Sequence, residues 1–482
     1  MKIAFLQNFW YEYLGVMSIS AVVKEKGHQT RVFINQAEKD FLQAVLLYDP
    51  DVICFPTYTG SQGWVLEKAL NFKKKTGKLI VLGGPHATFF PEIIKESGVD
   101  IVCRGEGEYP MVELLDALKD GQRFDKIKNL WVKKAIRQAH GKSRRVIKNP
   151  LRCLIDPLDK LPFLDREVYY RYRSLAHNRV KNFNIGRGCP FRCAYCHNAG
   201  LAKIYKGKGR YLRYHSQERV LQEIEMVRKK YPLKVVYFID DTFTANKKWL
   251  KRFLLLYKKR IGLPFVCNIR ADLLDKELSR SLSRAGCISV FMGVETGNEK
   301  MRIKLLNKQI TNKQFKKAAQ LLHQYKICLA ANNMIGLPGE SLKEALETLR
   351  FNTEIKVDLP WCAIFQPYPG TELTDYALEK GYVSKKEIEQ IGISFLKRSV
   401  LKNKNNRELV NLQKLFHLGV KFPWLVPVIK KLIKLPLIFI YDFIFLINQG
   451  LSYKRFFRFS MADFLPHAWY FGWFYLRSKK KT

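Results

Sequence analysis

The stretch that decides the fold is Cys189-Pro190-Phe191-Arg192-Cys193-Ala194-Tyr195-Cys196, which follows Gly186-Arg187-Gly188. Three thiols spaced C-x3-C-x2-C in one short loop indicate a site for a soft metal. Their number is informative, because an iron–sulfur cube contains four irons and three cysteines leave one iron open to another ligand. The alternative is a structural zinc site. It would need a fourth ligand, and His197 adjoins Cys196 too closely to complete a tetrahedron comfortably.

The length and composition indicate a globular protein of several domains. The chain has 482 residues, 47% of them hydrophobic, which predicts two or three domains. Seven of its ten cysteines are scattered, mostly in apolar runs, as expected for buried free thiols in a reducing compartment. Residues 1–6 run directly into a strand-like segment without a signal peptide, so we expect a cytoplasmic protein.

The charge is strongly basic, with 84 Lys and Arg against 43 Asp and Glu and a net charge of +41. Such a surface suits nucleic acid, anionic lipid or an acidic substrate. The excess is spread along the chain, and no RNA-binding motif concentrates it. We therefore do not expect nucleic acid to be the main partner.

Residues 1–135 alternate strand-like and helix-like segments, which predicts a doubly wound, Rossmann-like α/β domain. The apolar runs that read as buried parallel strands are Ile3–Leu6, Thr30–Ile34, Asp51–Pro56, Leu79–Leu82 and Asp100–Cys103. The stretches between them that read as helices are Val16–Lys26, Phe41–Tyr48, Trp64–Thr76 and Pro91–Ser97.

Ligands of such sheets bind beyond the carboxyl ends of the strands. Glycines at those ends would let the backbone approach a large ligand closely, and hydroxyl and amide groups there could orient it. The candidate residues are Asn8, Thr57, Tyr58, Gly83, Gly84, His86, Gly105 and Glu106. No G-x-G-x-x-G opens the first helix, which argues against a nicotinamide or flavin dinucleotide.

This domain resembles the cobalamin-binding domain of cobalamin-dependent radical SAM enzymes. The matching pieces are Leu14-Gly15, Gly27-His28, Pro50-Asp51-Val52, Gly83-Gly84-Pro85-His86-Ala87-Thr88 and Gly105-Glu106-Gly107-Glu108. The resemblance implies a corrinoid at the strand ends, with its nucleotide tail passing Gly83 and Gly84. No D-x-H-x-x-G motif is present, so we expect His86 to be a pocket residue and not a cobalt ligand. A Rossmann-like domain that has lost its cofactor is the alternative.

Residues 136–180 form a basic linker, in which Gly141 separates two short extended runs that suit a hairpin. Residues 181–375 then begin a second β-α series of six units, which predicts a partial (β/α)6 barrel with its chemistry at the carboxyl ends of the strands. The predicted strands are Asn182–Arg187, Lys234–Asp240, Phe265–Arg270, Cys287–Gly293, Cys328–Gly336 and Val357–Phe365.

Residues 376–482 form a basic, aromatic-rich extension that we expect to be helical. Its most apolar run, Leu435–Ile447, contains Pro436 and Asp442 and is shorter than the roughly 20 residues that a spanning helix needs. Apolar bulk beside basic residues suits peripheral contact with an anionic membrane, such as the inner membrane face. A helical lid packed over the preceding domains is the alternative.

The cysteine loop resembles the defining motif of the radical SAM superfamily. The resemblance implies that Cys189, Cys193 and Cys196 bind a 4Fe-4S cluster and that S-adenosylmethionine (SAM) occupies the open iron. It also implies SAM contacts from residues at later strand ends. These are Tyr195 near the adenine, Arg270 at the carboxylate, Glu295 at polar groups, Gly336 beside the adenine and Asp240 at the amino or ribose groups. The alternative role for Asp240 is to cap the following helix. The alternative role for Arg270 and Glu295 is to form buried ion pairs within the barrel.

The two resemblances together imply a cobalamin-dependent radical SAM methyltransferase. The expected reaction cleaves SAM reductively to a 5′-deoxyadenosyl radical and methylates an unactivated carbon of a small, lipid-like molecule. An external donor of the flavodoxin or ferredoxin type would supply electrons. Ring formation or rearrangement without methyl transfer is one alternative, and RNA modification is another.

Overall fold

A computed structural model of the chain describes residues 1–138, 141–392, 399–461 and 464. The chain divides into two compact units. The first contains Met1–Asn178 and Lys203–His215, and the second contains Arg179–Ala202 and Ser216–Thr482.

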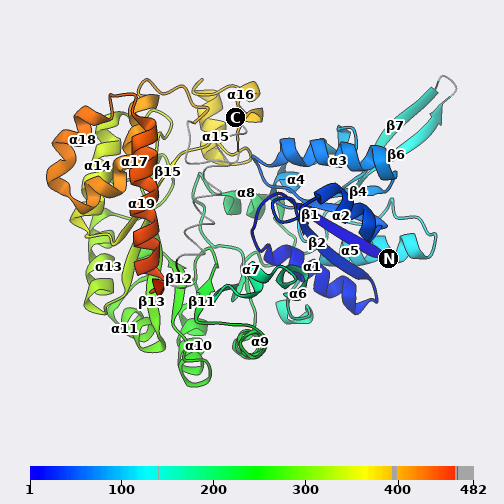
Figure 1. Cartoon of the computed structure of the whole chain (residues 1–482), viewed down its shortest axis with the longest axis horizontal. Helices are drawn as coiled ribbons and strands as arrows, with labels where there is room; N and C mark the ends of the chain where they lie inside the picture. Colours follow the sequence, from blue (N-terminus) through cyan, green and yellow to red (C-terminus); the bar gives the residue numbers. More distant parts are fainter. Residues whose placement is uncertain (139–140, 393–398, 462–463, 465–482) are drawn as a thin grey trace. The chain divides into compact units, whose positions relative to one another are not determined.

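The first unit is built on a seven-stranded sheet in the order β2-β1-β3-β4-β5-β6-β7 (Figure 1). Its strands are β1 (Lys2–Gln7), β2 (Gln29–Ile34), β3 (Val52–Pro56), β4 (Leu79–Gly83), β5 (Ile101–Cys103), β6 (Leu130–Gln138) and β7 (Gly141–Lys148). The first five strands pair in parallel, with Phe5 of β1 opposite Val32 and Cys54. The predicted doubly wound sheet is confirmed.

Helices cover both faces of this sheet. They are α1 (Leu14–Glu25), α2 (Phe41–Tyr48), α3 (Gln62–Thr76), α4 (Pro85–Phe89), α5 (Glu108–Lys119), α6 (Glu167–Tyr170) and α7 (Arg173–Ala176), with 3-10 turns η1 (Pro91–Lys95) and η2 (Leu158–Lys160). Alternate strand residues such as Leu6 and Phe55 pack against α2 and α3. On α1 and α5, Ser18 donates a hydrogen bond to Glu108.

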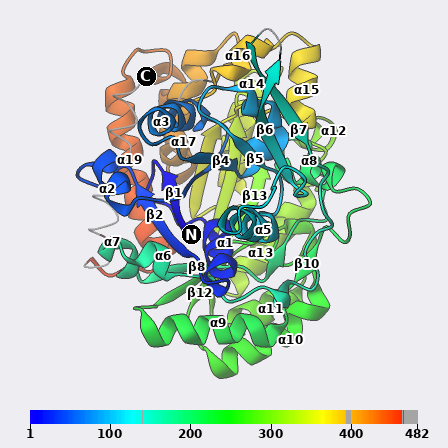
Figure 2. The same cartoon turned by 90° about the vertical axis from the view of Figure 1, so that its right-hand side faces the viewer.

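Two details differ from the sequence expectation. The helix predicted at 91–97 is instead the 3-10 turn η1 (Pro91–Lys95). Helix α4 ends before it at Phe89, because Pro91 lacks an amide hydrogen and cannot continue a helix. The hairpin that was expected in the basic stretch is present as β6 and β7 (Figure 2). It pairs antiparallel with β5, so β7 is the edge strand of the first sheet.

The second unit is built on six parallel strands that follow one another in chain order, β8-β11-β12-β13-β14-β15. In a (β/α) barrel, each new strand follows a helix and pairs in parallel with the strand before it, always on the same side. The partial (β/α) barrel is therefore confirmed. The strands are β8 (Val180–Phe183), β11 (Val235–Phe238), β12 (Phe265–Ile269), β13 (Cys287–Glu295), β14 (Cys328–Ile335) and β15 (Leu359–Ile364).

The barrel helices alternate with these strands. They are α8 (His197–Ile204), α9 (Gln217–Lys230), α10 (Lys247–Arg260), α11 (Lys276–Ala285), α12 (Glu299–Lys304), α13 (Asn312–Gln324), α14 (Leu342–Glu354), α15 (Glu372–Glu379) and α16 (Lys385–Glu389). Side-chain caps start several of them, such as Ser216 for α9 and Thr311 for α13. Short elements complete the chain: β9 (Gly186–Arg187), η3 (Ala271–Leu273) and, in the first unit, β10 (Arg213–Tyr214).

The described part of the carboxy-terminal extension is helical. Its elements are α17 (Asn406–Lys421), η4 (Pro423–Leu425), α18 (Val426–Leu432) and α19 (Ile438–Phe456). Apolar residues of α17 pack against β15 and α14, and α18 and α19 lie beside α17 in Figure 1. In the part of the chain that the structure describes, no helix is both long and apolar enough to cross a membrane.

Candidate functional site

The cysteine loop lies between β9 and α8. Its three cysteines are free thiols; Cys189 and Cys193 are buried and Cys196 is half-buried. Backbone bonds hold the middle of the loop, because Ala194 N donates to Leu306 O and Leu373 N donates to Ala194 O, each at 2.9 Å. The loop is thus fixed at the carboxyl side of the strands.

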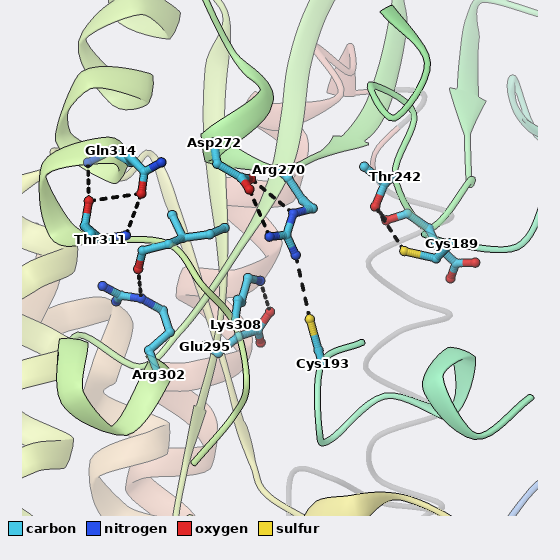
Figure 3. A network of polar contacts seen from close by, with 12 residues as sticks. Cys189, Cys193, Thr242, Arg270, Asp272, Glu295, Arg302, Lys308, Thr311 and Gln314 are labelled. Atoms are coloured by element: carbon cyan, nitrogen blue, oxygen red, sulfur yellow. Dashed lines mark hydrogen bonds and ion pairs between the residues drawn. The ribbon is translucent and has the colours of Figure 1, made fainter. Parts of the chain in front are cut away.

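Each of the three sulfur atoms has one polar neighbour from outside the cysteine motif. Arg270 Nη1 donates to Cys193 Sγ at 3.7 Å, and Cys189 Sγ lies 3.6 Å from Thr242 Oγ1 (Figure 3). Asn198 Nδ2 donates to Cys196 Sγ at 3.7 Å. Burial raises the pKa of the Cys189 thiol, and it raises that of Cys196 to about 12. Hydrogen bonds to ligating sulfurs are one of the means by which proteins tune iron–sulfur clusters.

Within residues 1–138, 141–392, 399–461 and 464, no three His, Cys, Asp or Glu side chains converge to hold one metal ion. A four-iron cube does not require three side chains to converge on one ion, because each cysteine binds its own iron. The donor set therefore suits the cube: three thiols from one loop, each with a polar neighbour, and no fourth cysteine in the motif.

Arg270 follows β12 and is held on two sides. Its guanidinium donates to both carboxylate oxygens of Asp272, at 3.1 and 3.0 Å, and it lies 3.5 Å from the centre of the Phe191 ring. The remaining Nη1 reaches Cys193. A fixed guanidinium beside the cysteine loop is suited to bind a carboxylate there.

Glu295 ends β13 with a left-handed backbone, φ 66°, and its side chain is buried. Its Oε1 accepts from Tyr195 Oη at 2.8 Å and from Lys308 Nζ at 2.9 Å. Gly293 makes room for this contact, because a Cβ there would lie 2.2 Å from Glu295 Oε1. Burial, followed by the charge of Glu295, raises the pKa of Tyr195 well above its usual value.

Asp240 follows β11, and its carboxylate accepts from Ile185 N and Gly186 N at 3.0 Å. Burial raises its pKa to about 7. The side chain that caps the next helix, α10, is Asn246. Asp240 thus fixes the backbone three residues before Cys189.

Gly336 follows β14 with φ 78°. Its carbonyl accepts from Asn403 Nδ2 at 3.1 Å, and its amide donates to Glu340 Oε2. Burial raises the pKa of Glu340 to about 8. The buried carboxyl group closes the turn that holds Gly336 beside the strand end.

In the first unit, the reversal of strand order falls between β1 and β3, where ligands of such sheets bind. Asn8 follows β1 and accepts from Asn35 Nδ2 at 2.9 Å. Tyr58 follows β3 and stacks on Tyr13 at 4.8 Å between ring centres. An aromatic surface at the switch point suits a large, flat cofactor such as a corrinoid.

The turn after β4 has no room for a side chain at Gly84. A Cβ at Gly84 would lie 2.9 Å from Thr57 O, and Thr57 N donates to Gly83 O at 2.7 Å. His86 follows on α4, with Nδ1 3.0 Å from Thr59 Oγ1, and burial lowers its pKa to about 4. The neutral imidazole is therefore a polar group beside the switch point.

Gly105 and Glu106 contact another part of the first unit. Arg213 donates to both carboxylate oxygens of Glu106, at 3.1 and 2.9 Å, and Glu106 N donates to Tyr205 Oη at 3.0 Å. A Cβ at Gly105 would overlap that tyrosine. Ile155 N also donates to Glu106, at 2.8 Å. These two motif residues therefore bind segment 203–215, and their predicted contact with cobalamin stays a prediction.

The sequence reasoning missed Thr242, Asn198 and Lys308. No local pattern marks Lys308 as buried. Thr242 and Asn198 carried one usable signal, since each lies two residues beyond a residue already singled out, Asp240 and Cys196.

Comparison with known proteins agrees with this architecture. The model of the radical SAM superfamily matches residues 183–351, and that of the B12 binding domain matches residues 9–115. The chain thus contains a radical SAM domain preceded by a B12-binding domain. It is an enzyme of the cobalamin-dependent radical SAM kind.

Two curated relatives each align with 76% of this chain at 28% identity. One is an uncharacterized methyltransferase of Pyrococcus horikoshii (PH0819), of which 78% is covered. The other is the anaerobic magnesium-protoporphyrin IX monomethyl ester cyclase of Rubrivivax gelatinosus, of which 65% is covered.

Two solved structures share the fold. The methyltransferase TsrM of Kitasatospora setae has a TM-score of 0.63 at 15% identity, over 79% of this chain and 76% of that one. OxsB has a TM-score of 0.59 at 19% identity, over 80% of this chain and 56% of that one. The radical SAM domain implies a 4Fe-4S cluster and SAM, and the B12-binding domain implies cobalamin; these are the cofactors of the enzyme.

Proposed function

We propose that this enzyme methylates an unactivated carbon of a small, apolar substrate. The observation that carries the proposal is the presence in one chain of a B12-binding domain and a complete cysteine motif, in the arrangement shared with a relative named as a methyltransferase. Bound together, the cluster and SAM supply a 5′-deoxyadenosyl radical and cobalamin carries the methyl group.

The residues of the second unit then have distinct tasks. Cys189, Cys193 and Cys196 hold three irons. Arg270 binds the SAM carboxylate, for which it is fixed by Asp272. Glu295 offers its second carboxylate oxygen to polar groups of SAM.

The remaining SAM contacts come from the loop and from two strand ends. Tyr195 lies near the adenine, and the Gly336 turn passes beside it. Asp240 acts through the backbone of Ile185 and Gly186, as a positioning residue for the cysteine loop.

In the first unit, the aromatic surface at Tyr58 and the narrow turn at Gly83-Gly84 are the proposed cobalamin contacts. Asn8 and His86 supply polar groups beside them. Thr57 is fully buried and its hydroxyl donates to Phe55 O at 3.2 Å, so it supports the turn from below. Gly105 and Glu106 support this edge through their bonds to segment 203–215.

The reaction balances with two molecules of SAM and two electrons for each methyl group transferred. One SAM and one electron yield methionine and a 5′-deoxyadenosyl radical, which becomes 5′-deoxyadenosine by taking the substrate hydrogen. The other yields S-adenosylhomocysteine and the methyl group. A donor of the flavodoxin or ferredoxin type supplies both electrons.

The test begins with anaerobic reconstitution with iron, sulfide and hydroxocobalamin, followed by iron and cobalt counts. The protein is then incubated with reductant, SAM carrying a deuterated methyl group, and a total small-molecule extract. Methylation predicts transfer of the label to an extract component, with 5′-deoxyadenosine and S-adenosylhomocysteine in equal amounts. Iron without retained cobalt would overturn the proposal.

A second candidate is ring formation without net methylation, which the similarity to the magnesium-protoporphyrin cyclase favours. The same incubation separates the two reactions. Ring formation predicts substrate-dependent 5′-deoxyadenosine with no label transfer and no matching S-adenosylhomocysteine.

We also propose that the enzyme works in peripheral contact with an anionic membrane. The basic, apolar carboxy-terminal extension supports this part of the proposal, because such a surface would bring an enzyme to a lipid-like substrate.

A further inference from the structure

Most of the exposed large apolar side chains among the described residues lie between Phe422 and Met461. Within that stretch the most exposed are Phe439 at 79%, Trp424 at 73% and Phe443 at 65%. Globular proteins rarely leave large apolar side chains together in water without a partner for them.

Helix α19 contains the largest part of this surface. Its exposed apolar residues recur every four positions, at Phe439, Phe443, Ile447 and Leu451, and Ile440 lies on the same side. Residues three to four apart share one face of a helix, so these side chains form a continuous stripe over three turns. We call these five residues the outer stripe of α19.

Among the residues that the structure describes, α19 makes its buried contacts through the face opposite to the outer stripe. Tyr441 and Phe445 are buried there, and Tyr441 Oη donates to Leu432 O at 2.6 Å. The helix carries one acidic residue, Asp442, which is buried with Lys414 at 3.4 Å. Ile440, Phe443, Ile447 and Leu451 of the outer stripe therefore remain as exposed apolar surface on the described part of the unit.

Exposed cations stand at both ends of the stripe. Lys430, Lys431 and Lys434 precede it, and Asn411 Nδ2, by donating to Ile433 O and Leu435 O, fixes the backbone on both sides of Lys434. Arg455 and Arg458 follow it. An apolar helix face bracketed by cations matches the acyl chains and anionic headgroups of a lipid surface, which is a complementarity of both charge and polarity.

We infer that the outer stripe of α19 is the surface on which the enzyme binds an anionic lipid membrane, with α19 lying in the plane of the interface and Trp424 at the headgroup level. This inference rests on the proposed membrane association and deepens it by naming the surface that binds the lipid. It does not depend on whether the reaction is methylation or ring formation.

The test uses the full-length reconstituted enzyme and co-flotation with vesicles of phosphatidylcholine alone or mixed with phosphatidylglycerol. The expected result is binding to the anionic vesicles. Phe443→Ser with Ile447→Ser should weaken binding at least about ten-fold, because two apolar side chains that would be buried in the bilayer are lost. Lys430→Glu with Lys434→Glu should abolish the preference for anionic vesicles.

The matched control is α10, which also carries an exposed leucine among lysines. Leu255→Ser and Lys258→Glu should leave vesicle binding unchanged. All variants should retain the iron content and the reductive SAM cleavage of the parent, which separates failure of this inference from failure of the proposed chemistry.

Three outcomes would overturn the inference. The first is no vesicle binding at any lipid charge. The second is concentration-dependent dimerisation that the Phe443→Ser, Ile447→Ser variant abolishes, which would make the stripe a contact between copies of the chain. The third is binding that occurs only after removal of residues 465–482, which would make that segment the occupant of the stripe.

Discussion

The hydroxyl group of Tyr195 donates a hydrogen bond of 2.8 Å to Glu295 Oε1. This bond joins the cysteine loop directly to the end of β13. The same oxygen accepts from Lys308, so one buried carboxylate organises an aromatic side chain of the loop and a cation from the α12–α13 connection. The loop is therefore positioned by side chains as well as by its backbone.

Replacing Lys308 by Met should destabilise the protein strongly. The buried Glu295 carboxylate would lose its cation, which costs about 3–5 kcal/mol for a buried pair. Urea denaturation of the apo protein should show this loss, and adding Glu295→Gln should recover a large part of it. Lys316→Met is the control, because its pair with Glu354 is exposed and should contribute no more than about 1 kcal/mol. Equal effects of the two lysine substitutions would contradict the interpretation.

Cys193→Ala should abolish reductive cleavage of SAM. Removing one of three iron ligands leaves the cube incompletely held, so bound iron should fall and 5′-deoxyadenosine should disappear. Cys153→Ala is the matched control, since Cys153 is an exposed cysteine outside the loop. Retained 5′-deoxyadenosine formation in the Cys193 variant would refute the cluster assignment.

Arg213→Met should loosen segment 203–215. Its guanidinium is 3% exposed and is the counter-ion of Glu106, so the variant leaves a largely buried carboxylate unpaired. Hydrogen exchange should report faster amide exchange in residues 105–108 and 203–215. Arg210→Met should change little, because the pair of Arg210 with Asp156 is exposed. Unchanged exchange in the Arg213 variant would show that the ion pair does not hold the segment.

His86 should make the first unit less stable in mild acid. Its folded-state pKa of about 4 lies below the usual value of 6.5, so between these values the unfolded chain binds the proton first. This contribution to stability is complete above pH 6.5 and is lost as the pH falls to about 4, at up to about 1.4 kcal/mol per pH unit. The unfolding free energy of the parent minus that of His86→Asn should therefore decrease as the pH falls from 6.5 to about 4. A difference independent of pH would show that the imidazole titrates normally.

Hydrophobic periodicity was sufficient to predict the two sheets. Buried parallel strands are short, apolar and bounded by polar residues, so β1 to β5 and the six barrel strands could be placed in sequence. The observed ends of helices and strands differed from the predicted ones where a residue's conformation depended on local chemistry. The helix predicted from Pro91 to Ser97 is a 3-10 turn that ends at Lys95, and β8 ends at Phe183 where a strand to Arg187 was expected.

Side-chain partners distant in sequence could not be predicted in this way. Lys308 is 13 residues from Glu295 and more than a hundred from Tyr195, and only the fold brings the three together. Glu106 shows the same limit. Its motif resembles a cofactor-binding sequence, yet its carboxylate lies against Arg213, 107 residues away.

The ion pair between Glu106 and Arg213 has a consequence for how this enzyme can be divided or recombined. Because segment 203–215 belongs with the first unit and its flanking residues belong with the second, neither unit is a continuous piece of the gene. A fragment that ends at Asn178 would carry Glu106 without its counter-ion and Gly105 without the tyrosine that fills its space. Exchange of B12-binding domains between relatives would therefore require three junctions in the chain, and a single-junction chimera would inherit a mismatched pair.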